Sequence, residues 1–331
     1  MDYRLKLSRL QSLSLLPIAS FAALIGSMVC MSFTPIFIRL SEIEIGPNAT
    51  IFNRFWIAAL GFGLLSQLLA VYHREEDTQP KEQKLYPVRI VWLLLADGTV
   101  LSIGLILWAW SLTQTSIANS SIIHNLIPIF TILGGWLALG QTFDRRFLIG
   151  MFVAIAGATL LEANDLLILC RGLVSKPLLG DLAALLSAVF FGIHPLIAEQ
   201  LRTNFNSITI MTWSSTTSSL LLLAVALIAE EQLFPSSATG WFSVIALALV
   251  GQMLGVGLWT YCLKKISSGF ASLVALLVPA LSAVEGWVVF SENLSLLTGV
   301  SFAVILFGMY LAISSTSAIK PGVESSYLIE Q

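Results

Sequence analysis

Two stretches of this chain, IIHNLIPIFTILGGW at residues 122–136 and LVALLVPALSAVEGW at residues 273–287, follow one pattern. Each is apolar, has a proline at its seventh position and ends in Gly-Trp, and the two lie 151 residues apart. Two tryptophan pairs and a proline pair in one ungapped register are hard to obtain by chance, so we interpret the stretches as copies of one unit. The nine identical pairs within residues 107–136 and 258–287 are Leu107 and Leu258, Trp108 and Trp259, Leu112 and Leu263, Ser116 and Ser267, Ser121 and Ser272, Leu126 and Leu277, Pro128 and Pro279, Gly135 and Gly286, and Trp136 and Trp287.

The composition of the 331-residue chain is that of an integral membrane protein. Charged residues make up 11% of it, against about a quarter in a soluble domain, and hydrophobic residues make up 56%. Apolar runs of about 20 residues recur, each long enough to cross roughly 30 Å of hydrocarbon. The net charge of −2 leaves no basic face for nucleic acid. We therefore predict an all-α integral membrane protein whose surroundings are the lipid bilayer, with no nucleic-acid partner.

Ten apolar runs are predicted to form transmembrane helices. They are too long for barrel strands of about 10 residues, and backbone groups in lipid must form hydrogen bonds within their own segment. The first run follows a basic start and is too long for a cleaved signal peptide, so we interpret it as a retained span. The predicted spans are residues 16–37, 48–71, 90–112, 117–139, 146–164, 178–200, 207–229, 238–262, 268–290 and 294–315.

The lysines and arginines predict the orientation of these spans. With the amino terminus inside, thirteen basic residues fall in the inner segments and only Arg39, Arg171 and Lys176 fall in the outer ones. The opposite orientation would break the positive-inside rule almost everywhere. Both termini are therefore expected in the cytoplasm, and the short loops favour a multi-pass protein of an inner or plasma membrane. The inner residues are Arg4, Lys6, Arg9, Arg74, Lys81, Lys84, Arg89, Arg145, Arg146, Arg202, Lys264, Lys265 and Lys320.

The repeat divides the ten spans into two halves of five. An offset of 160 residues places the first span on the sixth, with Pro35 on Pro195. Because five is odd, the second half must cross the membrane in the opposite sense, and such inverted repeats are typical of secondary transporters. The predicted segments are a cytoplasmic amino-terminal segment (1–15), the first five-helix repeat (16–164), an outer linker (165–177), the second five-helix repeat (178–315) and a cytoplasmic tail (316–331).

Each half resembles the EamA domain of the drug/metabolite transporter superfamily. The resemblance covers residues 20–315 and lies in NRFWIAALGFGLL, GLILWAWSLTQTSIANSSIIHNLIPIF and GLWTYCLKKISSGFASLVALLVPALSAVEGWVVFSENLSLLTGVSFAVILFGMYL. In that family a glutamate follows the proline of the fourth span in each half. Glu292 follows Pro279 in this way, whereas Gln141 stands at the same distance after Pro128. The resemblance implies a metabolite transporter, often an exporter driven by ion exchange, without specifying its substrate.

Ionisable side chains inside the spans are the candidate transport residues, because each costs about 2.5–3.5 kcal/mol near the bilayer centre. Arg54, His124 and Glu285 each lie about six or seven residues from the outer end of a span, roughly 9 Å deep. Such a set suits a substrate carboxylate or proton transfer. Asp97 lies roughly 10 Å from the inner face, where it suits an inner gate. We predict these four as substrate-binding or coupling residues.

Structural roles stay open for the same side chains. Arg54 could reach the outer interface, and Glu285 could simply join the second and ninth spans. Asp97 could bond to nearby backbone, and His124 could be a satisfied interior group. His194 precedes Pro195, whose missing N–H frees a carbonyl, so it could serve as local hydrogen-bond repair, and we leave it out of the predicted transport residues.

A second set of residues could line the pathway. Two tryptophans hold equivalent places in the halves, although tryptophans near span ends also gather in interfacial belts. Three amide side chains could bond to a substrate or join helices. Pro128 and Pro279 are expected to kink the fourth and ninth spans. The pathway candidates are Trp108, Asn119, Asn125, Gln252 and Trp259.

These patterns predict a secondary transporter that exports a small amino-acid-like or drug-like metabolite by alternating access, with proton antiport as the coupling considered. The alternatives are a sugar-phosphate or nucleotide-sugar exchanger, a channel, and a non-transporting sensor or assembly factor on the same fold. No catalytic group, metal site or cofactor is predicted, because Cys30, Cys170 and Cys262 lack metal-ligand spacing and the spans hold no paired catalytic residues. The expected partners are the solute, protons and lipid, and a homodimer is allowed.

Overall fold

The computed structural model describes residues 18–76, 87–169, 177–290 and 295–318, and these ranges are helical without any strand. Within them, nine segments are long and apolar enough to cross a membrane, and α8 supplies the tenth helix of the bundle. The predicted all-α architecture is therefore confirmed. The predicted segment 1–15, most of the linker 165–177 and most of the tail 316–331 lie outside the described residues, as do Cys170 and Glu292.

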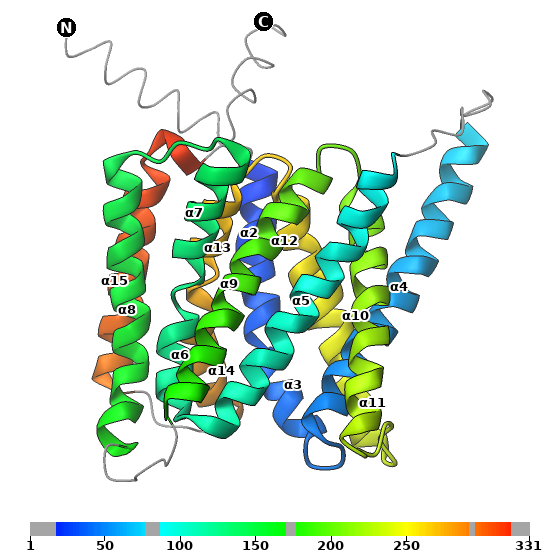
Figure 1. The fold of residues 1–331 in the computed structure, drawn as a ribbon, viewed down its shortest axis with the longest axis horizontal. Coiled ribbons are helices and arrows are strands. Elements are labelled where there is room, and N and C mark those ends of the chain that lie inside the picture. Colours follow the sequence, from blue (N-terminus) through cyan, green and yellow to red (C-terminus); the bar gives the residue numbers. More distant parts are fainter. Residues whose placement is uncertain (1–17, 77–86, 170–176, 291–294, 319–331) are drawn as a thin grey trace, which may run out of the picture.

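The helices run back and forth along one common direction (Figure 1). The start of α2 and the end of α15 lie at the same end of the bundle, as an even number of crossings requires. The first half consists of α2 (Ile18–Ser32), α3 (Thr34–Ser41), α4 (Pro47–Glu76), α5 (Val88–Gln114), α6 (Ile117–His124), α7 (Ile127–Leu139) and α8 (Arg145–Leu169). The second half consists of α9 (Pro177–Leu201), α10 (Ser207–Ile228), α11 (Ala238–Ala246), the π-helix η1 (Leu247–Val256), α12 (Gly257–Cys262), α13 (Ser268–Val274), α14 (Leu277–Phe290) and α15 (Leu296–Ile313), followed by the short η2 (Thr316–Ala318).

The first, fourth and ninth spans are each divided into two helices near a proline. Pro128 lies in the first turn of α7, and Pro279 lies in the first turn of α14. In the first turn the missing N–H of proline costs no helical hydrogen bond, so a new helix can begin there. The first span divides in the same way at Phe33, before Pro35, and then continues to Ser41, four residues beyond its predicted end at 37. The fifth also runs further than predicted, from 164 to Leu169.

The two halves repeat the details of helix capping as well as sequence. The Ser116 hydroxyl oxygen accepts a hydrogen bond from the backbone N–H of Asn119 at 3.1 Å and begins α6. Its counterpart Ser267 accepts from the N–H of Phe270 at 3.3 Å and begins α13. A serine at this position satisfies one of the free N–H groups of a helix start. The same local chemistry therefore starts the broken helix of each half.

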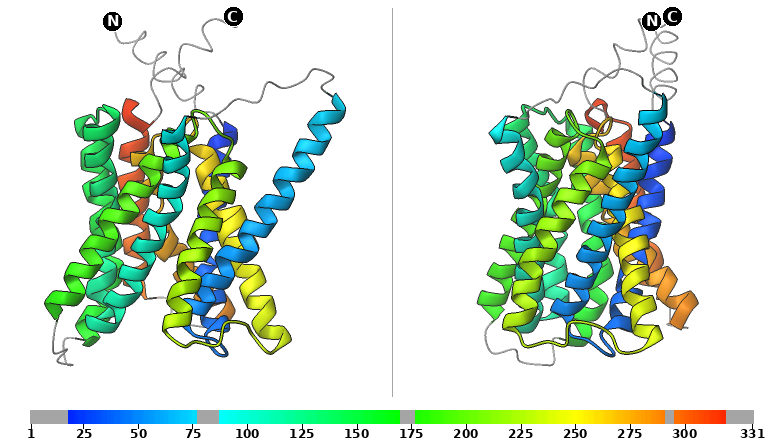
Figure 2. Two further views of the ribbon diagram at one scale, coloured as in Figure 1. Left: turned by 45° about the vertical axis from the view of Figure 1, so that its right-hand side comes forward. Right: turned by 90° about the vertical axis from the view of Figure 1, so that its right-hand side faces the viewer.

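Small residues bring the last helices of the two halves together. α8 and α15 pack along much of their length, and they stand side by side in both views of Figure 2. A Cβ atom placed on Gly308 would lie 2.5 Å from the backbone nitrogen of Ala154, and one on Gly157 would lie 2.8 Å from that of Ile305. Gly157 and Gly308 are equivalent at the 151-residue offset, so the interface is itself symmetric.

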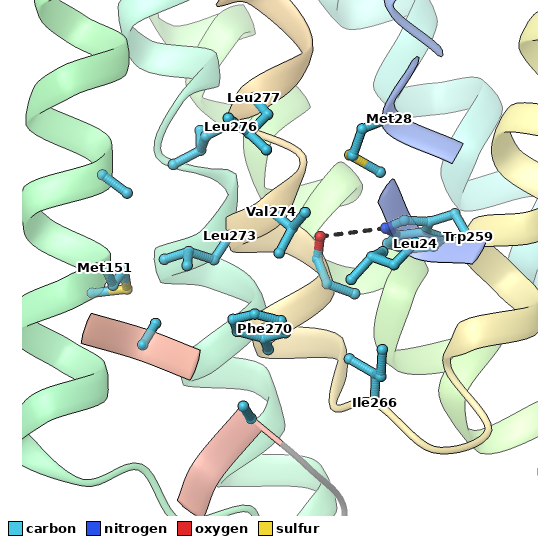
Figure 3. Packing of buried hydrophobic residues seen from close by; sticks show 14 of the residues in the cluster. Leu24, Met28, Met151, Trp259, Ile266, Phe270, Leu273, Val274, Leu276 and Leu277 are labelled. Carbon is cyan, nitrogen blue, oxygen red and sulfur yellow. Dashed lines mark hydrogen bonds between the residues drawn. The ribbon is translucent and has the colours of Figure 1, made fainter. Parts of the chain in front are cut away.

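The largest buried cluster gathers around α13, between α2, α8 and α12. Figure 3 shows Phe270 and Leu273 of α13 in this cluster, with Leu24 of α2 beside Trp259 of α12. The indole N–H of Trp259 donates to the carbonyl oxygen of Ala271 at 3.4 Å. The cluster joins helices of both halves, because α2 and α8 belong to the first and the others to the second.

At the bundle end opposite Ile18 and Ala318, two loops are joined by hydrogen bonds to carboxylates. Glu231, after α10, accepts hydrogen bonds from the Asn48 side chain at 2.6 Å and from the Ala49 backbone N–H at 2.7 Å, at the start of α4. Glu44, after α3, accepts from the backbone N–H groups of Ser236 and Ser237 and from both hydroxyls, at the start of α11. Each half therefore supplies a carboxylate to a helix start of the other, where negative charge is stabilised.

Candidate functional site

Asp97 and His194 form a buried pair between the two repeats. Asp97 lies on α5 in the first repeat, and His194 lies on α9 in the second. Nε2 of His194 lies 3.6 Å from Oδ2 of Asp97, within ion-pair range but too far for a good hydrogen bond. Neither carboxylate oxygen of Asp97 has a hydrogen-bond partner among the described residues. A buried carboxylate that lacks hydrogen bonds gains from binding a proton or another cation.

The surroundings of this pair come from two further helices. The imidazole of His194 stacks on the indole of Trp259, with ring centroids 5.9 Å apart and an interplanar angle of 14°. Next to Asp97, the carbonyl oxygen of Gly98 accepts a hydrogen bond from the Ser218 hydroxyl of α10 at 3.0 Å. Ser214, on the same helix, has a buried hydroxyl with no partner in the described residues. The pair is thus enclosed by α5, α9, α10 and α12.

Arg54 and Gln252 form a second polar contact between the repeats. Arg54 lies on α4, and its Nε donates to Oε1 of Gln252 on η1 at 2.9 Å. The guanidinium carbon lies 5.6 Å from the centroid of the Phe55 ring. Both side chains are buried, and Nε2 of Gln252 has no hydrogen-bond partner among the described residues. Arg54 therefore points into the bundle instead of extending to the membrane surface.

Glu285 lies in a separate environment on α14. Its Oε1 accepts a hydrogen bond from the Ser32 hydroxyl at the end of α2 at 2.6 Å, while Oε2 has no partner in the described part of the chain. The neighbouring Ser282 hydroxyl donates to the carbonyl oxygen of Ser32 at 2.7 Å. Among the described residues, Glu285 and Arg54 form no ion pair. The contact that Glu285 makes therefore joins the first and ninth spans.

His124 lies among aromatic rings at the end of α6. Its ring centroid lies 5.1 Å from that of Trp108 on α5 and 4.9 Å from that of Phe191 on α9. Nδ1 of His124 and the indole N–H of Trp108 are buried and have no hydrogen-bond partner in the described residues. This aromatic group contains none of Arg54, Asp97 and Glu285.

The other pathway candidates take different places. Trp259 is buried and Trp108 is half-buried, so neither lies in an exposed interfacial belt. Asn125 is the C-cap residue of α6, and its buried Nδ2 has no hydrogen-bond partner among the described residues. The backbone N–H of Asn119 is satisfied by the N-cap serine. The two tryptophans and Asn125 therefore remain candidates for the interior of the bundle.

Two buried ionisable residues of this region, His194 and Glu199, are not among the residues predicted from the sequence. His194 is absent from the predicted transport residues, yet α9 runs continuously through Pro195 and the imidazole faces Asp97. Glu199 lies within two residues of the end of the predicted sixth span, where a charge is ordinary. It is buried and accepts hydrogen bonds from the Gln141 side chain at 2.9 and 3.0 Å and from the Ser268 backbone N–H at 2.7 Å. Gln141, at the position where the family pattern has glutamate, thus joins the first repeat to the second.

The described residues contain no group of three or more metal-ligating side chains. Cys262 is buried, and its thiol lies 3.0 Å from the carbonyl oxygen of Ser20, while Cys30 is also a free cysteine. These cysteines act as packing residues in this arrangement.

Comparison with known proteins agrees with the two-repeat architecture. The sequence profile of the EamA-like transporter family matches residues 18–162 and again residues 178–314. A protein of known crystal structure superposes with a TM-score of 0.70 at 16% identity, over 89% of this chain and 96% of that one. At that identity the likeness concerns the fold alone.

Three named relatives are transporters. An uncharacterized transporter of Methanothermobacter thermautotrophicus is 24% identical over 66% of this chain, and the match spans 64% of the relative's length. An uncharacterized transporter of Archaeoglobus fulgidus is 22% identical over 59% of this chain and 67% of its own length. The pseudopaline exporter CntI of Pseudomonas aeruginosa is 23% identical over 68% of this chain and 75% of its own.

Proposed function

This chain belongs to the EamA-like transporter family, and we propose that it exports a small amino-acid-like or drug-like metabolite in exchange for protons. The family is one of multi-pass membrane transporters, so a small-molecule substrate and a lipid surrounding follow from membership. The export direction is supported by the relative named as a pseudopaline exporter. Alternating access is supported by the inverted repeat, because two related halves can open to either side around a site between them.

The observation that carries proton exchange is the Asp97 and His194 pair. The carboxylate belongs to one repeat and the imidazole to the other, so relative movement of the repeats would change their separation. A carboxylate and an imidazole can each bind and release a proton, so a pair whose separation changes has the chemistry for proton exchange. Proton uptake in one state and release in the other is what antiport requires.

Other titratable groups near the pair have their own neighbours. α10, which packs against α5, carries no titratable side chain, and neither does α7 or α13. Asp181 of α9 accepts a hydrogen bond from the Thr115 hydroxyl at 2.7 Å, and Glu199 is bonded to Gln141. The remaining titratable side chains on α5 and on helices packed against α5 or α9 are Arg89, His124, Tyr261 and Cys262.

We further propose that the bundle end holding Ile18 and Ala318 is cytoplasmic. At that end Arg145 and Arg146 begin α8 and Arg202 follows α9, as the positive-inside rule asks. Glu44 and Glu231 then face the outside of an inner or plasma membrane. Cysteine labelling from either side of sealed vesicles would test this, with Ser317→Cys expected to react only from the cytoplasmic side.

Proton movement in liposomes tests the exchange itself. Purified protein is reconstituted with a trapped pH-sensitive dye and challenged with amino acids, purine-like compounds and cationic drugs. We expect at least one solute to drive proton movement, and Asp97→Asn to reduce that movement at least tenfold while solute binding persists. Glu285→Gln is the matched carboxylate variant and is expected to retain the movement.

The alternative outcomes are distinct. If Glu285→Gln loses proton movement and Asp97→Asn keeps it, the coupling carboxylate is Glu285. If solutes cross without any proton movement in the wild type, proton exchange is wrong although transport stands.

A further inference from the structure

Arg54 is a buried cation without an anion. Its side chain is 9% exposed, and among the described residues its interactions are the hydrogen bond to Gln252 and the contact with the Phe55 ring. Four described carboxylates within the spans are engaged elsewhere: Asp97 with His194, Glu285 with Ser32, Asp181 with Thr115 and Glu199 with Gln141. A buried charge that has no partner is costly, and an anion that binds to it recovers part of that cost.

The free donors of Arg54 point to the shape of that anion. Nε is occupied by Gln252, which leaves both terminal nitrogens, Nη1 and Nη2, without a protein acceptor in the described residues. Those nitrogens form the planar fork that pairs with two oxygens of one carboxylate. A single arginine balances one negative charge, whereas a phosphate group calls for several cations.

Gln252 adds a donor beside this fork. A guanidinium can only donate, so the glutamine atom that faces Arg54 must be its oxygen, and the amide nitrogen is on the other branch. That nitrogen is fully buried and has no acceptor among the described residues. Two side chains from different repeats, in contact with each other, therefore carry unused N–H groups.

The backbone around Gln252 is also unusual. Gln252 lies inside η1, a π-helix of ten residues, and such wide turns are frequent at functional sites. Glycines on both sides of it bring the first repeat close: a Cβ on Gly251 would lie 2.8 Å from Oγ1 of Thr34, and one on Gly255 would lie 2.7 Å from Cγ of Met31. The π-helix thus holds Gln252 against α2, α3 and α4 at the seam between the repeats.

We propose that Arg54 and Gln252 bind the carboxylate of the transported solute. The substrate class is therefore organic acids with a free carboxylate, including amino acids, and it excludes cationic amphiphiles without one. This assignment rests on the transport function proposed above and narrows its substrate. Arg54 fixes the anion by charge and by its fork, and Gln252 orients the guanidinium and contributes its own N–H.

A thermal-shift experiment on the purified protein tests the site without knowledge of the full substrate. Sodium acetate and sodium formate serve as minimal carboxylates, with sodium chloride and sodium phosphate at equal ionic strength. We expect the carboxylates to raise the Tm of the wild type by about 2 °C at concentrations ten times their Kd, and the other salts to have no comparable effect. Equal shifts with all four salts would overturn a carboxylate site.

Gln252→Glu separates binding from a structural role. It places a carboxylate of the protein against Arg54, so we expect a folded protein at least as stable as the wild type, with no acetate shift and transport reduced at least tenfold. If the Arg54 contact is only structural, this ion pair would leave transport intact, which would contradict the proposal. Retention of the acetate shift would contradict it as well.

Arg54→Gln and a matched control complete the design. Arg54→Gln is expected to lose the acetate shift. Arg202→Gln removes another buried arginine, one that donates to the carbonyl oxygens of Phe205 and Tyr261 at 2.6 and 3.3 Å, and it is expected to keep the shift.

Transport of paired solutes distinguishes the two proposals. In liposomes, each amino acid of a panel is compared with its amide and with its decarboxylated amine. Transport of acids only supports the site. Transport of amides and amines equally well overturns it while leaving the transport function standing, and an acetate shift without transport of any solute leaves the site standing while contradicting the function.

Discussion

The seam between α5 and α9 and the equivalent seam between η1 and the first span have the same place in the repeat but different chemistry. At the 160-residue offset His194 corresponds to Thr34, and Pro195 to Pro35. α9 runs unbroken through Pro195 and sets His194 against Asp97, whereas the first span breaks at Phe33. The repeat therefore determines where helices meet, and individual side chains determine what each meeting point can do.

The same comparison separates the two proposed tasks. The first seam holds the buried acid, which suits a proton. Gln252 of η1 meets the buried base Arg54 of the neighbouring helix α4, and this contact suits a carboxylate. Both contacts join one repeat to the other, so the rocking movement proposed for the repeats would alter both sites together. That is the condition for coupling a solute to a proton.

The largest expected effect comes from disrupting the symmetric interface between α8 and α15. Gly308→Leu drives a side chain into the backbone of α8, so we expect destabilisation by about 3 kcal/mol and little folded protein. Gly157→Leu, its repeat counterpart, should show a comparable loss. The measurement is the yield of monodisperse protein and its Tm.

Gly299→Leu is the control on the same helix α15, because nothing lies within 4 Å of a Cβ at that position. A normal yield for Gly308→Leu would show that the α8 and α15 interface is loose.

The next effect tests a position at which the two halves differ, His194 in the second and Thr34 in the first. His194→Gln removes the imidazole opposite Asp97 and is expected to reduce proton-coupled transport about tenfold and to shift its pH profile. Thr34→Val changes the equivalent residue of the other seam and is expected to change transport less than twofold. Initial rates in liposomes between pH 5 and pH 8 measure both. Equal losses in the two variants would contradict the assignment of the proton to one seam.

A smaller effect compares the two N-cap serines. Ser116→Ala removes one cap and is expected to cost about 1 kcal/mol of unfolding free energy. Ser267 also donates to the carbonyl oxygen of Ser317 at 3.0 Å, so Ser267→Ala is expected to cost about 2 kcal/mol. Unfolding in mixed detergent micelles gives both values. If Ser116→Ala lost more unfolding free energy than Ser267→Ala, the stability lost with a cap would not depend on the additional hydrogen bond of the serine.

The smallest effect concerns the loops at the bundle end opposite Ile18 and Ala318. Hydrogen bonds from Ser237 and Ser236 lower the pKa of Glu44 below its ordinary value of 4.5. Its stabilising contribution is therefore present above pH 4.5 and is lost as the pH falls through the lower pKa of the folded protein. We expect Glu44→Gln to flatten the loss of Tm at acidic pH.

Glu230→Gln changes an exposed carboxylate in the neighbouring loop and is the control. If both variants respond to acid as the wild type does, the Glu44 contacts contribute nothing to stability.

Much of the architecture was predictable from sequence because lipid constrains the backbone so strongly. The ten spans and the two halves follow from run length and register. The kinks predicted at Pro128 and Pro279 are divisions into two helices in the structure. Candidate residues were predictable as types, since any ionisable group in a span is conspicuous. The neighbours of these residues were not predictable, because partners such as Glu285 and Ser32 lie 253 residues apart in the chain.

Local composition and spacing were enough to predict the fold class, the repeat and the polar groups within the spans. Which of these groups meet depended on the packing of the helices: Asp97 with His194, Arg54 with Gln252, and Glu199 with Gln141. These pairings depend on helix rotation and on close approach at small residues such as Gly251, which no local pattern records. The physical reason is that backbone hydrogen bonding in lipid acts within a segment, whereas partner choice acts between segments.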